Sequence, residues 1–165
     1  MTLSTESAFE AYEAVRHRLP TVVPTDGGYR HASTLADIAD EFDVFLLDAF
    51  GVLNIGEAAI PGTPERIKAL TGVGKRVLVV SNAAGFPHQA LMEKYSRLGY
   101  DFAPEDVITS RVTLLAGLNG RHDLHWGLMA TRSTGLRDLE DLTLTYLEED
   151  PAAYDEVEGF LLVGS

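Results

Sequence analysis

The feature that most constrains the fold is a short apolar run that ends on an acid, in the stretch FLLDAFGVLN. Residues 44–47 (VFLL) are continuously apolar, which is typical of a strand buried on both faces of a parallel sheet. Asp48 follows directly, and Gly51 allows the chain to turn. The pattern therefore predicts a strand that delivers one carboxylate to its carboxyl end.

From residue 43 onward, apolar strand-like runs alternate with helix-like segments. The predicted strands are 44–47, 77–80 and 105–109, and the predicted helices are 63–71, 87–98 and 110–118. We expect Thr63 and Ser110 to cap the first and third of these helices, and Gly99 to end the second. Such alternation implies right-handed βαβ units. The predicted fold class is therefore α/β, a Rossmann-like parallel sheet with helices on both faces.

Three regions are expected along the chain. Residues 1–42 read as a helical N-terminal extension, with an apolar stripe at Phe9, Tyr12 and Val15. That stripe is most simply explained by packing, and a dimer contact is the alternative, so a homo-oligomer stays open. Residues 43–120 read as the N-terminal part of the α/β core. Residues 121–165 read as the start of a further domain, and they end on the strand-like run FLLVGS. Because a buried strand needs hydrogen-bonding neighbours, we expect this chain to be the front part of a longer protein.

Composition narrows the range of partners. The formal net charge of −12 works against a phosphate-backbone partner, because nucleic-acid binding depends on clustered Lys and Arg. The chain has no cysteine, which excludes disulfides and thiolate chemistry. Its N-terminus lacks the basic start and apolar core of a signal peptide, and no apolar run approaches the ~18 residues of a membrane span. We expect a cytoplasmic protein that binds neither nucleic acid nor membrane.

Two predicted strand ends carry polar residues. Asp48 follows the first strand, and Ser81 with Asn82 closes the second. In open parallel sheets, ligands bind beyond the carboxyl ends of the strands. The turn after the first strand can also present backbone N–H groups to an anion. The residues that supply these groups are Ala49, Phe50 and Gly51. The set suits phosphate chemistry, with Asp48 as a nucleophile; the alternative is that the carboxylate and the hydroxyl only cap turns.

The stretch DAFGVLNIGEAAIPGTPERIKAL followed by VLVVSNAAGF resembles the haloacid dehalogenase (HAD) superfamily of aspartate-nucleophile hydrolases. Within it, the chain most resembles the NagD-like, p-nitrophenylphosphatase-like branch. The resemblance continues through LGY and EDVITS. It covers residues 43–110 well and the remainder loosely. It implies a HAD-like core and hydrolase activity on a small-molecule phosphate ester.

The resemblance also implies roles for the matching residues. Asp48 would attack phosphorus to form an aspartyl-phosphate and would bind Mg²⁺ through its other oxygen. The backbone carbonyl of Phe50 would be a second metal ligand. Ser81 and the backbone of Asn82 would bind the transferring phosphoryl group. Catalysis of this kind consists mostly of positioning and charge neutralisation.

The chain departs from the family pattern in two ways. Phe50 stands where most family phosphatases have a second aspartate as general acid and base, and such help is worth roughly 10²–10⁴ in rate. The family's lysine and later acidic metal-binding motif have no counterpart in these 165 residues. We therefore expect little phosphatase activity from this chain alone. A catalytically weak or regulatory HAD-like protein is the main alternative function.

The second alternative is a haloacid dehalogenase, because DAFGV also resembles the DAYGT strand end of those enzymes. Halide leaves without a proton, so that chemistry needs no acid at position 50. Spacing argues against it, since the dehalogenases resembled carry a helical cap between the aspartate and the Ser/Thr strand. Only one crossover helix fits between Asp48 and Ser81. Room for a cap lies after Ser110, where STGLRDL and FLLVGS resemble the beginning of an inserted α/β cap domain, assigned to residues 121–165.

Overall fold

The computed structural model describes residues 4–21, 23, 27–130, 136–147 and 151–163. The chain divides into two compact units, Met1–Ser33 and Thr34–Ser165. Among the described residues, no helix combines the length and apolar character that crossing a membrane requires.

The first unit contains one helix, α1 (Thr5–Val15), continued by a short 3₁₀ turn, η1 (Arg16–Arg18). Ser4 caps α1 because its Oγ accepts a hydrogen bond from the backbone N–H of Ser7 at 3.1 Å. The apolar stripe predicted from the sequence is exposed on this helix, with Phe9 63% and Tyr12 47% accessible.

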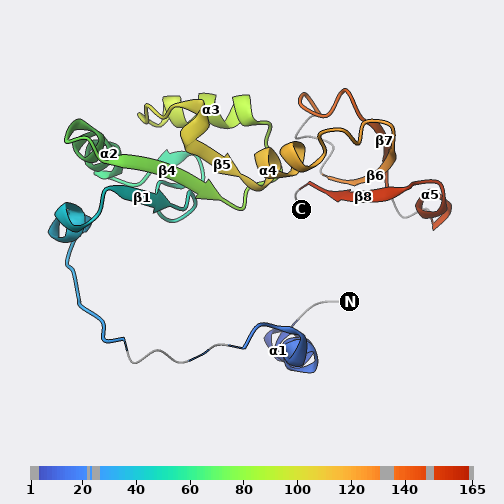
Figure 1. Ribbon diagram of the computed structural model, residues 1–165, viewed down its shortest axis with the longest axis horizontal. Helices are drawn as coiled ribbons and strands as arrows, with labels where there is room; N and C mark the ends of the chain where they lie inside the picture. The colour runs from blue at the N-terminus through green and yellow to red at the C-terminus, as the bar shows by residue number, and fades with distance from the viewer. Residues whose placement is uncertain (1–3, 22, 24–26, 131–135, 148–150, 164–165) are drawn as a thin grey trace. The chain divides into compact units, whose positions relative to one another are not determined.

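The second unit begins with η2 (Leu35–Glu41) and contains the predicted parallel sheet (Figure 1). Its strands are β1 (Val44–Leu47), β4 (Arg76–Ser81) and β5 (Val107–Thr109), hydrogen-bonded in the order β1-β4-β5. Both pairs are parallel, so the predicted α/β class with a parallel sheet is confirmed. Between β1 and the next helix, β2 (Asn54–Ile55) and β3 (Ala58–Ala59) form a small antiparallel pair.

Helices connect the parallel strands as the sequence predicts. They are α2 (Thr63–Gly72), α3 (His88–Arg97) with η3 (Pro104–Asp106), and α4 (Ser110–Gly117). For two helices, the observed N-cap is the residue before the one that the sequence predicted. Gly62, at φ +82°, is the N-cap of α2 in place of Thr63, because its left-handed backbone favours glycine. Thr109 is the N-cap of α4 in place of Ser110.

The two faces of the first sheet differ. On one face, strand residues such as Val79 pack with α2 and α3 into the first core cluster. Its buried members are Phe45, Ala49, Leu53, Ile67, Leu70, Val77, Val79, Leu91, Tyr95, Tyr100 and Val107. The alternate side chains are largely exposed, with Leu46 65% and Val80 42% accessible. The prediction of helices on both faces is thus met on one face only within the described residues. The apolar runs of the strands show that both faces are apolar, but not what covers each of them.

A second parallel sheet follows, in the order β7-β6-β8. Its strands are β6 (His125–Met129), β7 (Thr143–Tyr146) and β8 (Gly159–Leu162), and α5 (Pro151–Asp155) lies between the last two in the chain. The second core cluster comprises the buried residues Leu118, Trp126, Leu128, Leu139, Leu161 and Val163. Leu114 and Leu115 of α4 pack against this cluster, so α4 starts at the end of β5 and buries its apolar face beside the second sheet.

The predicted domain boundaries at residues 42/43 and 120/121 remain predictions. Part of the STGLRDL stretch that resembles the start of a cap lies outside the described residues.

Candidate active site

The carboxyl ends of the first three parallel strands meet at one edge of their sheet. In the register of β1 and β4, Leu47 lies beside Val79. In the register of β4 and β5, Ser81 lies beside Thr109. Asp48 is therefore one residue beyond a position level with Val79, and Ser81 is two residues beyond it. The fold places both predicted catalytic residues at the same edge, as expected for a ligand site of an open parallel sheet.

The turn after β1 is held by its own backbone. Asp48 is exposed, and its Oδ1 accepts the N–H of Ala49 at 2.7 Å. The carbonyl of Ala49 accepts the N–H groups of residues 52, 53 and 54, and Gly51, at φ +80°, donates its N–H to Asn54 O at 2.9 Å. Of the three amides predicted to bind phosphate, those of Ala49 and Gly51 therefore already have acceptors in the turn. Within the described part of the chain, the amide of Phe50 has none.

Two side chains that the sequence reading missed fix this turn. Asn54 is 5% exposed, and its Nδ2 donates to Gly56 O at 2.8 Å. Tyr100 is 4% exposed, and its hydroxyl donates to Leu53 O at 2.5 Å. The signal for Asn54 was a polar residue directly after the apolar GVL run. Tyr100 lies 47 positions away in the chain, so nothing local to the turn points to it.

Ser81 ends β4 and is 9% exposed. Its Oγ accepts the N–H of Ala83 at 3.2 Å, which orients the start of the loop towards α3. Asn82 beside it is exposed. In the neighbouring strand, Thr109 Oγ1 accepts the N–H of Val112 at 3.2 Å, which begins α4 at the same edge.

The charge of Asp48 influences a buried phenol behind the site. Tyr95 on α3 is 1% exposed, and burial raises its pKa to about 12. The negative charge of Asp48 adds to this increase in the pKa, and Tyr100 contributes less. Tyr95 therefore stays protonated and neutral throughout the physiological range.

The residues at the strand end partly suit a hard metal ion. The Asp48 carboxylate and the Phe50 carbonyl are oxygen donors, the ligand type that Mg²⁺ prefers. Magnesium commonly binds through one or two carboxylates and keeps several waters. The described residues contain no group of three or more His, Cys, Asp or Glu side chains that could hold a metal. The donor set therefore fits Mg²⁺ in kind and supplies a single carboxylate. The Phe50 side chain, 70% exposed, has no proton to transfer.

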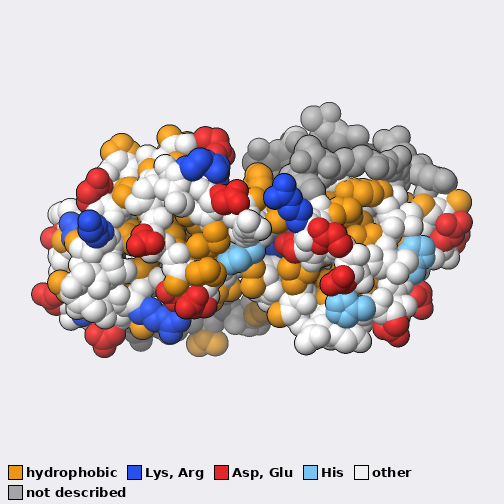
Figure 2. All heavy atoms as spheres, turned by 90° about the horizontal axis from the view of Figure 1, so that it is seen from above, with side chains coloured by type: hydrophobic (Ala, Val, Ile, Leu, Met, Phe, Trp, Pro, Cys, Tyr) orange, Lys and Arg blue, Asp and Glu red, His pale blue; other side chains and the backbone are white. Residues whose placement is uncertain are grey.

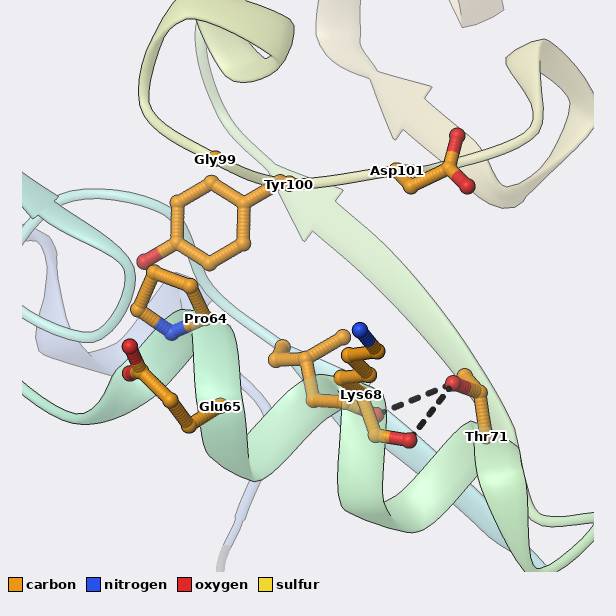
Figure 3. A pocket seen from close by; sticks show the side chains of 8 residues that line it. Pro64, Glu65, Lys68, Thr71, Gly99, Tyr100 and Asp101 are labelled. Carbon is orange, nitrogen blue, oxygen red and sulfur yellow. Dashed lines mark hydrogen bonds between the residues drawn. The ribbon is translucent and has the colours of Figure 1, made fainter.

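One face of the molecule is mixed in charge. On the face shown in Figure 2, Lys and Arg side chains lie apart from one another, with acidic side chains among them. A separate cavity of about 410 Å³ lies between α2 and the chain after α3. In it, Tyr100 faces Pro64 and Glu65 across the opening (Figure 3). None of its lining residues is a predicted site residue, so this cavity is distinct from the strand-end site.

The sequence profile of haloacid dehalogenase-like hydrolases matches residues 45–139, which include the whole strand-end site. The chain belongs to this family. The chain is similar to human glycerol-3-phosphate phosphatase, with 41% identity over 71 residues, and to 4-nitrophenylphosphatase of Schizosaccharomyces pombe, with 35% identity over 74 residues. These alignments cover 43% and 45% of this chain, but 21% and 25% of the two relatives.

The fold is shared with solved HAD structures. A protein of Cytophaga hutchinsonii described as a possible sugar phosphatase superposes with a TM-score of 0.67 at 19% identity. The superposition covers 81% of this chain and 48% of that protein. The chain thus spans about a fifth to a half of the length of these proteins. The resemblance to the NagD-like and p-nitrophenylphosphatase-like HAD phosphatases is confirmed, and the relatives are named phosphatases.

Proposed function

We propose that the protein carrying this chain is a Mg²⁺-dependent phosphatase that acts on small phosphate monoesters, with Asp48 as the nucleophile. The observation that carries the proposal is the strand register, which brings Asp48 and Ser81 to one edge of the first sheet. A carboxylate, a hydroxyl and a tight turn of backbone at one strand edge suit phosphoryl transfer.

In the proposed reaction, a carboxylate oxygen of Asp48 forms a bond to phosphorus while the bond from phosphorus to the ester oxygen breaks. The leaving group departs with the electron pair of that bond, and water later cleaves the aspartyl-phosphate to give inorganic phosphate and free Asp48. The hydroxyl of Ser81 and the amides of Phe50 and Asn82 would donate hydrogen bonds to the phosphoryl oxygens. Ala49 and Gly51 would act mainly by holding the turn, because their amides already have acceptors.

Bound Mg²⁺ would neutralise phosphoryl charge, and Asp48 with the Phe50 carbonyl would hold it. The substrate class follows from the relatives, whose names specify glycerol-3-phosphate and 4-nitrophenyl phosphate. A cytoplasmic location remains a prediction.

The test replaces Asp48 in the complete gene product and measures Mg²⁺-dependent hydrolysis of 4-nitrophenyl phosphate. We expect Asp48→Asn to lower turnover by roughly 10³-fold or more, as loss of a nucleophile does in other hydrolases. Thermal unfolding should stay unchanged, because Asp48 is exposed.

The matched control is Glu158→Gln. Glu158 also binds a backbone N–H through its carboxylate, that of His125 at 2.8 Å, but it does so beside the second sheet. This variant should keep full turnover. Undiminished activity in Asp48→Asn would remove Asp48 from the mechanism.

Two parallel assays separate the alternatives. Release of halide from a 2-haloacid without metal would indicate a dehalogenase. A wild-type protein that binds phosphate at the strand edge but turns over neither substrate would indicate a catalytically weak or regulatory relative, in accord with Phe50 at the acid position.

A further inference from the structure

Arg111 is the most deeply buried charged residue described, with 1% of its surface exposed. It is the second residue of α4 and the one charged residue of that helix. A buried guanidinium is costly unless it is paired and hydrogen-bonded. The sequence reading did not single it out, because burial of an Arg is not visible in a local pattern.

Arg111 joins two different parts of the fold. Its Nε lies 2.9 Å from each carboxylate oxygen of Asp138, and its Nη2 also donates to Asp138. Its Nη1 donates to the carbonyl of Ala84 at 3.1 Å. Asp138 precedes Leu139, which is buried in the second core cluster. Ala84 lies three residues after Ser81, in the loop between β4 and α3.

That loop has few other restraints in the described structure. Apart from the bond of Ala83 N–H to Ser81 Oγ, the contact of Ala84 O with Arg111 is the hydrogen bond that ties residues 82–85 to another element. Ala84 lies two residues after Asn82, whose amide is one of the donors in the proposed phosphate site, and the Ala84 carbonyl is bound by a side chain that α4 carries.

We infer that Arg111 is a positioning residue: it holds the Ser81–Ala84 loop in its anion-binding shape, and Asp138, from the segment beside the second sheet, holds Arg111. This inference deepens the proposed function and rests on it for the identity of the anion. It means that a carboxylate outside the phosphate site controls how well that site binds phosphate.

The experiment compares Asp138→Asn with a matched variant, Asp106→Asn. Asp106 pairs with Arg76 at 3.0 Å and its side chain is 24% exposed, against 22% for Asp138. It lies at the opposite end of β4 from Ser81. Each variant of the 165-residue chain is followed by ¹H–¹⁵N NMR, which gives hydrogen exchange of the amides of residues 82–85 and their shifts on titration with inorganic phosphate.

We expect Asp138→Asn to speed exchange of the Ala83 amide, which is hydrogen-bonded to Ser81 Oγ, by about tenfold or more, to shift the amide resonances of residues 82–85, and to weaken phosphate binding by a similar factor. Exchange within β4 should not change, and Asp106→Asn should match the wild type in both readouts. Wild-type exchange and affinity in Asp138→Asn would overturn the inference, and so would equal effects in the two variants.

A second variant covers the case in which Asp138→Asn fails to fold. Arg111→Met with Asp138→Leu replaces the ion pair by apolar side chains, a change that buried pairs often tolerate. It removes the donor to Ala84, so the Ala83 amide should again exchange faster, and protection of Ala83 equal to wild type would refute the role of Arg111. If the wild-type chain shows no phosphate-induced shifts at Ser81 and Asn82, the proposed site fails, while the exchange data still decide the role of Arg111.

Discussion

The described residues form two three-stranded parallel sheets that differ at their carboxyl ends. In the first, β1 and β4 lead to Asp48 and to Ser81 with Asn82. In the second, the strands lead to Ala130, Leu147 and Val163, all apolar. Both sheets offer the same backbone geometry at this edge. The residues that follow the strands decide whether the edge can bind a ligand or only extends the core.

The two sheets also differ in how closely neighbouring side chains pack against the strand backbone. Gly127 and Gly159 lie in the second sheet. A Cβ added to Gly127 would lie 2.7 Å from Leu147, and one added to Gly159 would lie 2.4 Å from the Trp126 ring. The strands β1, β4 and β5 contain no glycine. In the second sheet, side chains thus pack closely over strand glycines, whereas the first sheet carries polar groups at the carboxyl ends of its strands. Three substitutions test this contrast.

The largest effect is expected at Phe50. Without an acid there, the leaving group departs unprotonated, so the rate in the complete gene product should fall steeply as the leaving-group pKa rises. Phe50→Asp should flatten that dependence and raise turnover of poor leaving groups, at most by the ~10²–10⁴ that acid–base catalysis supplies. A second carboxylate beside Asp48 disfavours ionisation of both groups, so the gain should be partial. The measurement is a leaving-group series on both proteins.

The control for this series makes the same substitution in the second sheet. Phe160 is 56% exposed on β8, comparable with Phe50 at 70%. Phe160→Asp should leave the leaving-group slope as in the wild type. Equal slopes in wild type and Phe50→Asp would show that another residue provides the proton.

An intermediate effect is expected at Gly159. Gly159→Ala forces the buried Trp126 ring to move and should destabilise the second sheet by about 3 kcal/mol. Gly72→Ala, at the end of α2 where the added Cβ meets nothing within 4 Å, should be neutral or stabilising by up to ~1 kcal/mol. Urea unfolding followed by tryptophan fluorescence measures the stability of the second sheet, because Trp126 is the single tryptophan of the chain. A stable Gly159→Ala variant would contradict the close packing of β8 against β6.

The smallest effect is expected at Tyr95 and only at alkaline pH. Its pKa is raised from 10.0 to about 12 in the folded chain, so the folded state holds the phenolic proton more tightly than the unfolded state. The resulting stability is complete below pH 10 and is lost as pH rises towards 12, by about 2 kcal/mol at pH 12. Tyr95→Phe should unfold as the wild type does at neutral pH and lose less stability between pH 10 and 12. Parallel pH curves for the two proteins would show that Tyr95 does not titrate in this way.

The sequence predicted the parts of the fold that are encoded locally. The runs VFLL and VLVV became β1 and most of β4, and the glycine after α3 ends that helix at φ +88° as expected. The caps were less well predicted. The sequence offered Thr63 and Ser110, but in the structure the residue before each of them, Gly62 and Thr109, is the N-cap.

By itself, the sequence determined that a carboxylate and a hydroxyl follow two neighbouring parallel strands, because side-chain order and strand polarity fix which end each residue occupies. Only the tertiary structure decided that the amides of Ala49 and Gly51 are used within the turn. It also decided that α4 buries its apolar face in the second cluster and that Arg111 joins Ala84 to Asp138. The two Arg111 contacts each join residues 27 positions apart, and the energy of all these contacts depends on burial that no local pattern contains.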